Sequence, residues 1–125
     1  MDKEKLQLIS EQFKTALARL GEVLAEEKSA IVRDAAIQRF EFVFDLSWKF
    51  IKIYLQVNQG IACASPKSCW REAYQQKIIT YDDIWLQMTD DRNRTVHTYD
   101  QKAAEEIFNK LPKYFKLFQE LEKYC

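Results

Sequence analysis

Residues 31–55 read IVRDAAIQRFEFVFDLSWKFIKIYL and predict one long helix that is apolar around much of its circumference. The apolar positions recur every three or four residues but fill more than one stripe: Ile31, Ala35, Ala36, Phe40, Val43, Phe44, Leu46, Trp48, Ile51 and Leu55. Such a helix must be covered on two sides. We therefore expect it to be the central helix of a bundle, or to face a second subunit as well.

The sequence before and after this segment predicts further helices. Apolar residues from position 6 to position 24 follow the same spacing, which predicts a helix that ends near Glu26. Ser29 is suited to cap the central helix, and Gly60 is suited to end it in the left-handed conformation. Ser65 and Pro66 are typical of the start of a short third helix.

Two more helices are expected after position 79. Thr80 is a candidate cap for a fourth helix with an acidic first turn. Thr98 and Gln101 fit a capping box for the last helix, with Asp100 as a competing cap. Pro112 lies inside the last helical pattern, so we expect a kink or a restart there.

The composition favours helices in one domain. Only two Gly and two Pro, with 47% hydrophobic and 30% charged residues, leave little material for hairpins. We therefore expect residues 1–125 to form a single all-α domain, an antiparallel up-and-down bundle of four to five helices that a homodimer would extend.

The formal net charge is zero, so any RNA contact must come from a local patch. No apolar run approaches the length needed to span a bilayer, and the N-terminal MDKEKLQLISEQF is amphipathic and acidic rather than typical of a signal peptide. We expect a cytoplasmic protein without membrane contact. Cys63, Cys69 and Cys125 are odd in number and lack C-x-x-C spacing, which predicts reduced thiols and neither a disulfide framework nor a zinc site.

The only histidine lies in residues 91–99, DRNRTVHTY, between arginines and a tyrosine. Histidine exchanges protons near neutral pH, and arginine binds phosphate oxygens with a forked geometry. Together these groups suggest phosphodiester chemistry that needs neither metal nor cofactor. On an unbroken helix Arg92 and His97 would point about 140° apart, but the β-branched residues around His97 favour an earlier helix end and a turn that brings the two side by side.

The two arginines have different neighbours. Arg94 follows Asp90 and Asp91 by four and three residues, so a surface ion pair is its ordinary role and contact with phosphate or RNA the alternative. Arg92 has no acid at these spacings, which leaves its charge available for a phosphate unless a carboxylate from another helix binds it. Asp45 is expected to form a surface pair with Lys49 instead.

Each aromatic or titratable residue also has an ordinary structural interpretation. His97 would then be a hydrogen-bonded histidine at a helix junction, and Tyr99 an interface aromatic with a solvated hydroxyl. The aromatic residues of the central helix are interpreted as core or dimer surface rather than as a platform for stacking bases: Phe40, Phe42, Phe44, Trp48 and Phe50.

Arg92, four intervening residues and His97 give the pattern R-x4-H, which Tyr99 extends to R-x4-H-x-Y. This pattern resembles the signature of HEPN domains, small dimeric helical bundles found widely in bacterial toxin systems. Residues 35–49, AAIQRFEFVFDLSWK, are similar to the second helix of one branch of these domains, the nucleotidyltransferase substrate-binding proteins. The resemblance covers the chain from its first predicted helix to its last.

The resemblance implies a partner and a site. Members of this family are encoded beside a minimal nucleotidyltransferase and form a complex with it. The residues that match Arg92 and His97, with the polar residue that matches Asn93, are the RNase residues of the toxin and lie in a cleft at the dimer interface. The tyrosine that matches Tyr99 accepts AMP from the partner, which silences the toxin.

Three functions remain open at this point. In the first, the protein is a metal-independent endoribonuclease in which His97 moves a proton and Arg92 stabilises the charge that develops at phosphorus. In the second, it is a non-catalytic subunit that holds a substrate or nucleotide for the transferase, and the same two groups bind phosphate. In the third, it is a purely structural helical adaptor.

Overall fold

The computed structural model describes residues 2–125, and this range is helical with no strand. Five α-helices follow one another: α1 (Asp2–Leu24), α2 (Ala30–Gln59), α3 (Pro66–Gln75), α4 (Asp82–Arg94) and α5 (Gln101–Glu122). A single 3-10 turn, η1 (Thr95–His97), follows α4 directly. The predicted all-α class is confirmed.

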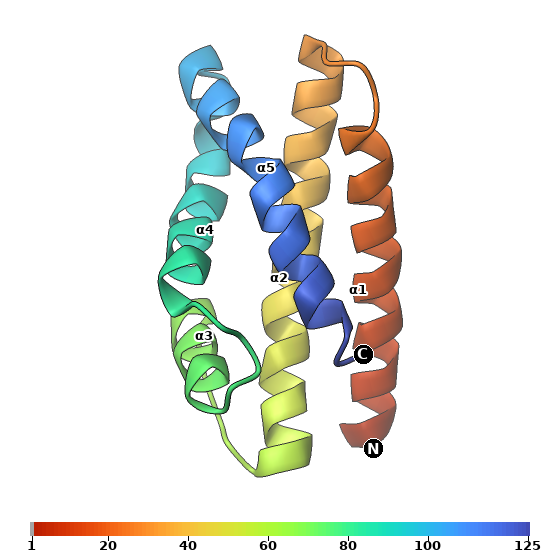
Figure 1. Ribbon diagram of the computed structural model, residues 1–125, viewed down its shortest axis with the longest axis vertical. Coiled ribbons are helices and arrows are strands. Elements are labelled where there is room, and N and C mark those ends of the chain that lie inside the picture. Colours follow the sequence, from red (N-terminus) through yellow and green to blue (C-terminus); the bar gives the residue numbers. More distant parts are fainter. Residues whose placement is uncertain (1) are drawn as a thin grey trace.

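The helices form an up-and-down bundle in which two short helices, α3 and α4, together take the place of one long helix (Figure 1). α1 and α2 run side by side in opposite directions, α3 and α4 lie one above the other beside α2, and α5 returns across the bundle to the end where the N-terminus lies. None of the helices in the described range is long and apolar enough to cross a membrane.

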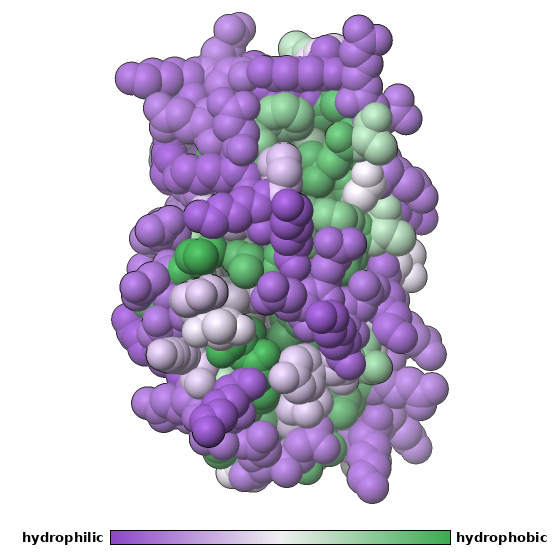
Figure 2. All heavy atoms as spheres, viewed as in Figure 1, coloured by the Kyte–Doolittle hydropathy of each residue, from purple (hydrophilic) through white to green (hydrophobic). Residues whose placement is uncertain are grey.

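α2 is the central helix, as its apolar circumference predicts, because it contacts all four of the other α-helices. Phe40 stacks on Tyr114 of α5, with the ring centroids 5.7 Å apart, and Phe44 meets the Trp70 ring of α3 edge to face. Trp70 in turn packs against Trp85 of α4. These buried aromatic contacts hold α3, α4 and α5 against one side of α2. The face of the bundle in Figure 2 is mostly hydrophilic, with apolar side chains visible in the seams between helices.

Most of the predicted helix ends are confirmed. The Ser29 hydroxyl accepts a hydrogen bond from the backbone N–H of Val32, Ser65 forms a capping box with Ser68, and Gly60 ends α2 with a φ of 65°. That φ lies in the left-handed region that glycine adopts without steric cost.

Two predictions about helix caps need correction. Thr80 does not cap α4, because the helix begins one residue later than expected, at Asp82, and its N-cap position is taken by Tyr81, which makes no side-chain cap. Asp100 rather than Thr98 caps α5, since the Thr98 hydroxyl donates to the Thr95 carbonyl.

Of the two outcomes expected at Pro112, the structure excludes a restart, because α5 is continuous there. Its neighbours Leu111 and Tyr114 are almost fully buried, whereas the proline ring is exposed. Packing on both sides of the proline therefore maintains the helix where local propensity would end it.

The expectation of reduced thiols is wrong for two of the three cysteines. Cys63 and Cys69 form a disulfide with their Cα atoms 5.2 Å apart, and Cys125 alone is free. The reason is tertiary: the loop after Gly60 turns back at Ser65, so Cys63 lies against the first turn of α3 although the two cysteines are six residues apart.

Candidate functional site

The candidate site lies where α4 gives way to η1. α4 ends at Arg94, so the prediction that the helix stops before His97 is confirmed. The Thr95 hydroxyl donates to the Arg92 carbonyl at 2.6 Å, and the Thr98 hydroxyl donates to the Thr95 carbonyl. These side chains satisfy carbonyls at the end of the helix and fix the turn that carries His97.

Arg92 is held by carboxylates of α2. Its Nε and Nη2 donate to the two carboxylate oxygens of Asp45, both at 3.2 Å, and Nη1 lies 3.8 Å from the Glu41 carboxylate. Nη1 also donates to the Thr95 hydroxyl at 2.9 Å. The guanidinium is therefore paired. Of the two alternatives expected for its charge, the structure shows the second, a carboxylate from another helix.

The predicted ion pair between Asp45 and Lys49 is wrong, because Asp45 pairs with Arg92 and no ion pair joins it to Lys49 within residues 2–125. The signal that sequence reasoning missed was Glu41 and Asp45, four residues apart on one side of α2 and exposed enough to reach a neighbour. Three of the five N–H groups of Arg92 donate within the chain, which leaves two for a ligand. The side chain keeps 23% of its surface exposed, so a phosphate oxygen has access to it.

His97 and Tyr99 form an exposed pair at the turn. Nδ1 of the imidazole lies 3.3 Å from the Tyr99 hydroxyl, and the two rings meet edge to face. Tyr99 is 83% exposed. Within residues 2–125 no hydrogen bond joins His97 to Arg92, so their placement side by side stays a prediction.

The remaining candidates have simpler surroundings. Asn93 is exposed and makes no side-chain hydrogen bond within residues 2–125. Arg94 donates to Asp91 at 3.3 Å and to Glu106 at 2.7 Å. The expected ion pair of Arg94 with Asp91 is thus confirmed, and Glu106 of α5 adds to it.

Asp91 is buried, and the sequence predicted only its ion pair with Arg94. Its carboxylate accepts from the Tyr114 hydroxyl at 2.5 Å and from Lys110 at 3.2 Å, both on α5. Burial and the neighbouring Asp91 carboxylate raise the pKa of Tyr114, because both disfavour a phenolate. This network joins the residue directly before Arg92 to α5.

The site as a whole combines a proton-transfer group with a restrained cation. His97 is exposed and its Nδ1 contacts only the Tyr99 hydroxyl, whereas Arg92 presents two N–H groups from a fixed position. Within residues 2–125 no group of three His, Cys, Asp or Glu side chains is arranged to hold a metal ion. The exposed part of the Arg92 guanidinium suits binding of a phosphate group, and His97 lies on the turn that follows the same helix.

Residues 8–125 match the family described as nucleotidyltransferase substrate binding protein like. The chain belongs to this HEPN-type family. The present structure superposes on that of a protein from Thermus thermophilus with a TM-score of 0.83 and 40% sequence identity. The match covers 87% of this chain and 94% of the Thermus chain.

A second solved structure comes from Haemophilus influenzae and is described as the fold of a substrate-binding domain of a nucleotidyltransferase. It matches with a TM-score of 0.82 and 26% identity, over 92% of this chain and 97% of that one. A curated relative from the same organism, named "Probable ribonuclease HepT", is 38% identical over 87 residues. That match covers 63% of this HEPN-type chain and about 60% of the relative.

Proposed function

We propose that this protein is a metal-independent endoribonuclease of the cytoplasm that acts as a homodimer and is silenced when a partner nucleotidyltransferase transfers AMP to Tyr99. The observation that carries the proposal is the placement of one imidazole and one restrained guanidinium at the same helix end. Similarity to a relative named as a probable ribonuclease adds support.

The cleavage step needs few protein groups. The 2′-hydroxyl of the RNA attacks the adjacent phosphorus, and the bond to the 5′-oxygen of the next nucleotide breaks. His97 takes the proton from the attacking hydroxyl or gives one to the leaving oxygen. Arg92 stabilises the negative charge that develops on the phosphate oxygens. With two copies in one dimer, one His97 acts as base and the other as acid.

Asp45 and Glu41 have a defined part in this proposal. They hold the Arg92 guanidinium in place before RNA arrives, so less side-chain freedom is lost on binding. Asn93, next to Arg92, is exposed and able to hydrogen-bond the same phosphate or the ribose. Arg94 already pairs with Asp91 and Glu106, which favours the ion-pair role over contact with phosphate or RNA.

The test of the cleavage step compares wild type with Arg92→Ala and His97→Ala. We expect expression of the wild type to stop growth, and the purified protein to cut RNA in the presence of a chelator. Loss of one proton-transfer group should slow cleavage about 10²- to 10⁴-fold, with a comparable loss for Arg92→Ala.

Arg71→Ala is the matched control, because Arg71 is exposed on α3 and forms no ion pair within residues 2–125. Its cleavage rate should equal that of the wild type. Equal rates for all four proteins would contradict the assignment of Arg92 and His97.

The contact between Tyr99 and His97 supports the proposed silencing step. The Tyr99 oxygen would bond to the α-phosphorus of ATP, with release of pyrophosphate and of the hydroxyl proton. Because this hydroxyl lies 3.3 Å from Nδ1, an adenylate there would cover the imidazole and repel the RNA backbone. The partner enzyme is expected to be a minimal nucleotidyltransferase encoded by an adjacent gene.

Tyr99→Phe should keep its RNase activity and escape silencing when the partner and ATP are added. Mass spectrometry of the wild type should find the added mass on the peptide that contains Tyr99. The control is Tyr81→Phe, which removes another exposed hydroxyl and should still be silenced. Silencing of Tyr99→Phe would refute the acceptor assignment.

A second candidate function is a non-catalytic subunit that binds substrate for the transferase. Two carboxylates next to Arg92 favour it, because they lower the local positive charge that an RNA backbone would meet. The solved structure described as a substrate-binding domain points in the same direction. Under this function all variants would be equally inert toward RNA, while Arg92→Ala would weaken nucleotide binding.

A further inference from the structure

The disulfide between Cys63 and Cys69 is a covalent feature that the proposed cleavage and silencing steps do not use. Cys63 lies in the loop that follows α2, and Cys69 lies in the first turn of α3. Disulfides are rare in the reducing cytoplasm, and those that form there are usually transient, with a catalytic or redox-sensing role. For a protein of the cytoplasm, as proposed above, this pair is therefore a candidate regulatory site.

The two cysteines differ in accessibility. Cys63 keeps 8% of its surface exposed in a stretch without regular secondary structure, whereas Cys69 is fully buried. A thiolate from a reductant therefore approaches the bond through Cys63 and attacks its sulfur. Cys69 then leaves as a thiolate in the first turn of α3, where the helix dipole stabilises a negative charge. The bond is thus open to exchange from one side.

The exchange balances in both directions. Reduction by a protein dithiol converts the disulfide to two thiols and the dithiol to its own disulfide, with transfer of two electrons and two protons. Oxidation by hydrogen peroxide joins the two thiols again and releases two molecules of water. The Cα atoms of Cys63 and Cys69 are 5.2 Å apart, within the range that a disulfide spans. The fold therefore holds the two thiols close enough to pair again.

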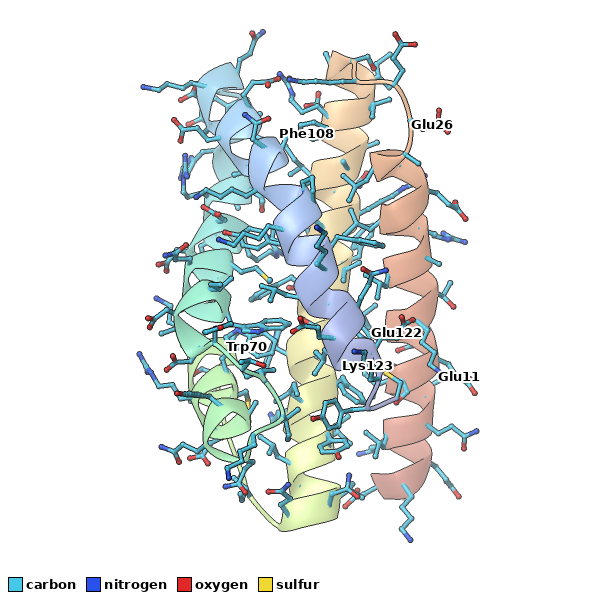
Figure 3. All side chains as sticks on the ribbon, viewed as in Figure 1. Glu11, Glu26, Trp70, Phe108, Glu122 and Lys123 are labelled. Carbon is cyan, nitrogen blue, oxygen red and sulfur yellow. A yellow bond between two sulfur atoms is a disulfide. The ribbon has the colours of Figure 1, made fainter. Side chains whose placement is uncertain are left out.

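The residues next to Cys69 connect α3 to α4. Lys67 forms an ion pair with Asp90 at 2.8 Å, and the indole N–H of Trp70 donates to the Thr89 hydroxyl at 2.9 Å. The buried Trp70 side chain points from α3 into the bundle (Figure 3). α4 packs against α3 more extensively than against any other α-helix. The part of α3 that holds Cys69 therefore supports α4 close to its C-terminal end.

Arg92 follows these contacts along α4. Thr89 and Asp90 precede it by three and two residues, so a shift at the contact with α3 is passed along the helix to the guanidinium. The two hydrogen bonds from Arg92 to Asp45 of α2 depend on where α4 lies. Asp91 anchors the same end of α4 to α5. Loss of the contacts with α3 should therefore displace this end of α4 without releasing it.

We propose that Cys63 and Cys69 form a reversible thiol–disulfide switch that controls the candidate site. The disulfide form holds α3 on α4 and keeps Arg92 in position, whereas the dithiol form loosens α3, whose ten residues are marginal for an isolated helix. Oxidation thus activates the protein, and reduction attenuates it. The effect on RNA cleavage rests on the proposed function, but the coupling of the two cysteines to Arg92 does not.

Hydrogen exchange measured by mass spectrometry tests this coupling without RNA. Closure of so short a loop stabilises the folded form by a factor of roughly thirty, so reduction of the wild type should speed exchange of the amides of α3 and of residues 85–92 by about that factor. Cys63→Ser should exchange at the faster rate with or without reductant, because Cys69 alone cannot form the bond. Unchanged exchange in residues 85–92 would overturn the proposal.

Cys125→Ser is the matched control. Cys125 is free and exposed, so this variant should respond to reductant as the wild type does. A response that is lost in Cys125→Ser would assign the effect to the wrong thiol and would also overturn the proposal.

Glutathione buffers of graded redox potential test the switch itself. The rate of RNA cleavage by the wild type should follow the oxidised fraction, measured by thiol alkylation of the same samples, and should fall on the order of tenfold when the pair is reduced, because a small displacement of Arg92 slows the reaction. Cys63→Ser should keep the low rate in every buffer. A rate that is independent of the oxidised fraction, or a disulfide that no buffer in the cytoplasmic range reduces, would contradict the switch. If the wild type cuts no RNA in any buffer, the proposed function fails, and the exchange of residues 85–92 still decides the coupling.

Discussion

At the scale of single residues, the organising group of the site is Asp91, which touches no ligand itself. Its buried carboxylate accepts hydrogen bonds from Arg94, Lys110 and Tyr114. A buried carboxylate is stable only when such partners compensate for its lost hydration. Because Asp91 directly precedes Arg92, the same bonds fix the backbone from which the guanidinium reaches α2.

Removal of the Tyr114 hydroxyl should show how strong this anchor is. Tyr114→Phe deletes a hydrogen bond to a charged group, and we expect the free energy of unfolding at neutral pH to fall by about 1.5–3 kcal/mol. Urea unfolding followed by circular dichroism measures this change. Tyr74→Phe is the control. Tyr74 lies half-exposed on α3, so its substitution should change the free energy of unfolding little.

The same residue should make stability depend on alkaline pH. The pKa of Tyr114 is raised above its ordinary value of 10.0, so above that pH the folded protein keeps a proton that the unfolded chain loses. The free energy of unfolding should therefore fall as pH rises beyond about 10. Tyr114→Phe should lack this part of the decline; identical slopes for wild type and variant would contradict it.

At the scale of elements, α3 depends on tertiary support more than the other helices do. It has only ten residues, a length that is marginal for an isolated helix. The buried ring of Trp70 and the disulfide from Cys63 to Cys69 join it to α4 and to the loop after α2. Trp70 also donates to the Thr89 hydroxyl at 2.9 Å, which satisfies its indole N–H inside the core.

Reduction of the disulfide should loosen α3 without unfolding the bundle. Closure of so short a loop contributes about 2 kcal/mol by its effect on the unfolded chain. We expect the Tm to fall on addition of a reductant, and the double variant Cys63→Ser with Cys69→Ser to show a low Tm that the reductant leaves unchanged. Cys125→Ser should behave as the wild type because Cys125 is free and exposed.

At the scale of the whole molecule, the absence of net charge limits how RNA is bound. With formal charge zero, the attraction must come from the few cations at the candidate site. Each phosphate contact to single-stranded RNA contributes about −0.7 to the slope of log K against log salt. A dimer that uses two Arg92 groups should therefore bind with a slope near −1.4.

Fluorescence anisotropy with labelled RNA measures this slope, and His97→Ala prevents cleavage during the titration. Addition of Arg92→Ala to that variant should bring the slope close to zero. A slope several times steeper than −1.4 would indicate a wider basic surface than two Arg92 groups provide.

Local residue patterns predicted much of this protein. The apolar repeat of residues 31–55 predicted a central helix, and Ser29, Gly60 and Ser65 marked helix ends that the structure confirms. These features depend on spacing and on hydrogen bonds within four residues, which the chain specifies by itself. The end of α4 before His97 was predicted for the same reason.

The tertiary structure decided what depends on distant parts of the chain. Asp45 is 47 residues from Arg92, and no local pattern indicated that it would bind the guanidinium and not Lys49. Cys63 reaches Cys69 only because the loop turns back, and α5 passes through Pro112 only because its two sides are packed. The sequence by itself therefore determined the helices and the candidate groups, since both follow from neighbours along the chain. Packing determined which charges remain accessible, because opposite charges meet wherever the bundle brings their helices together.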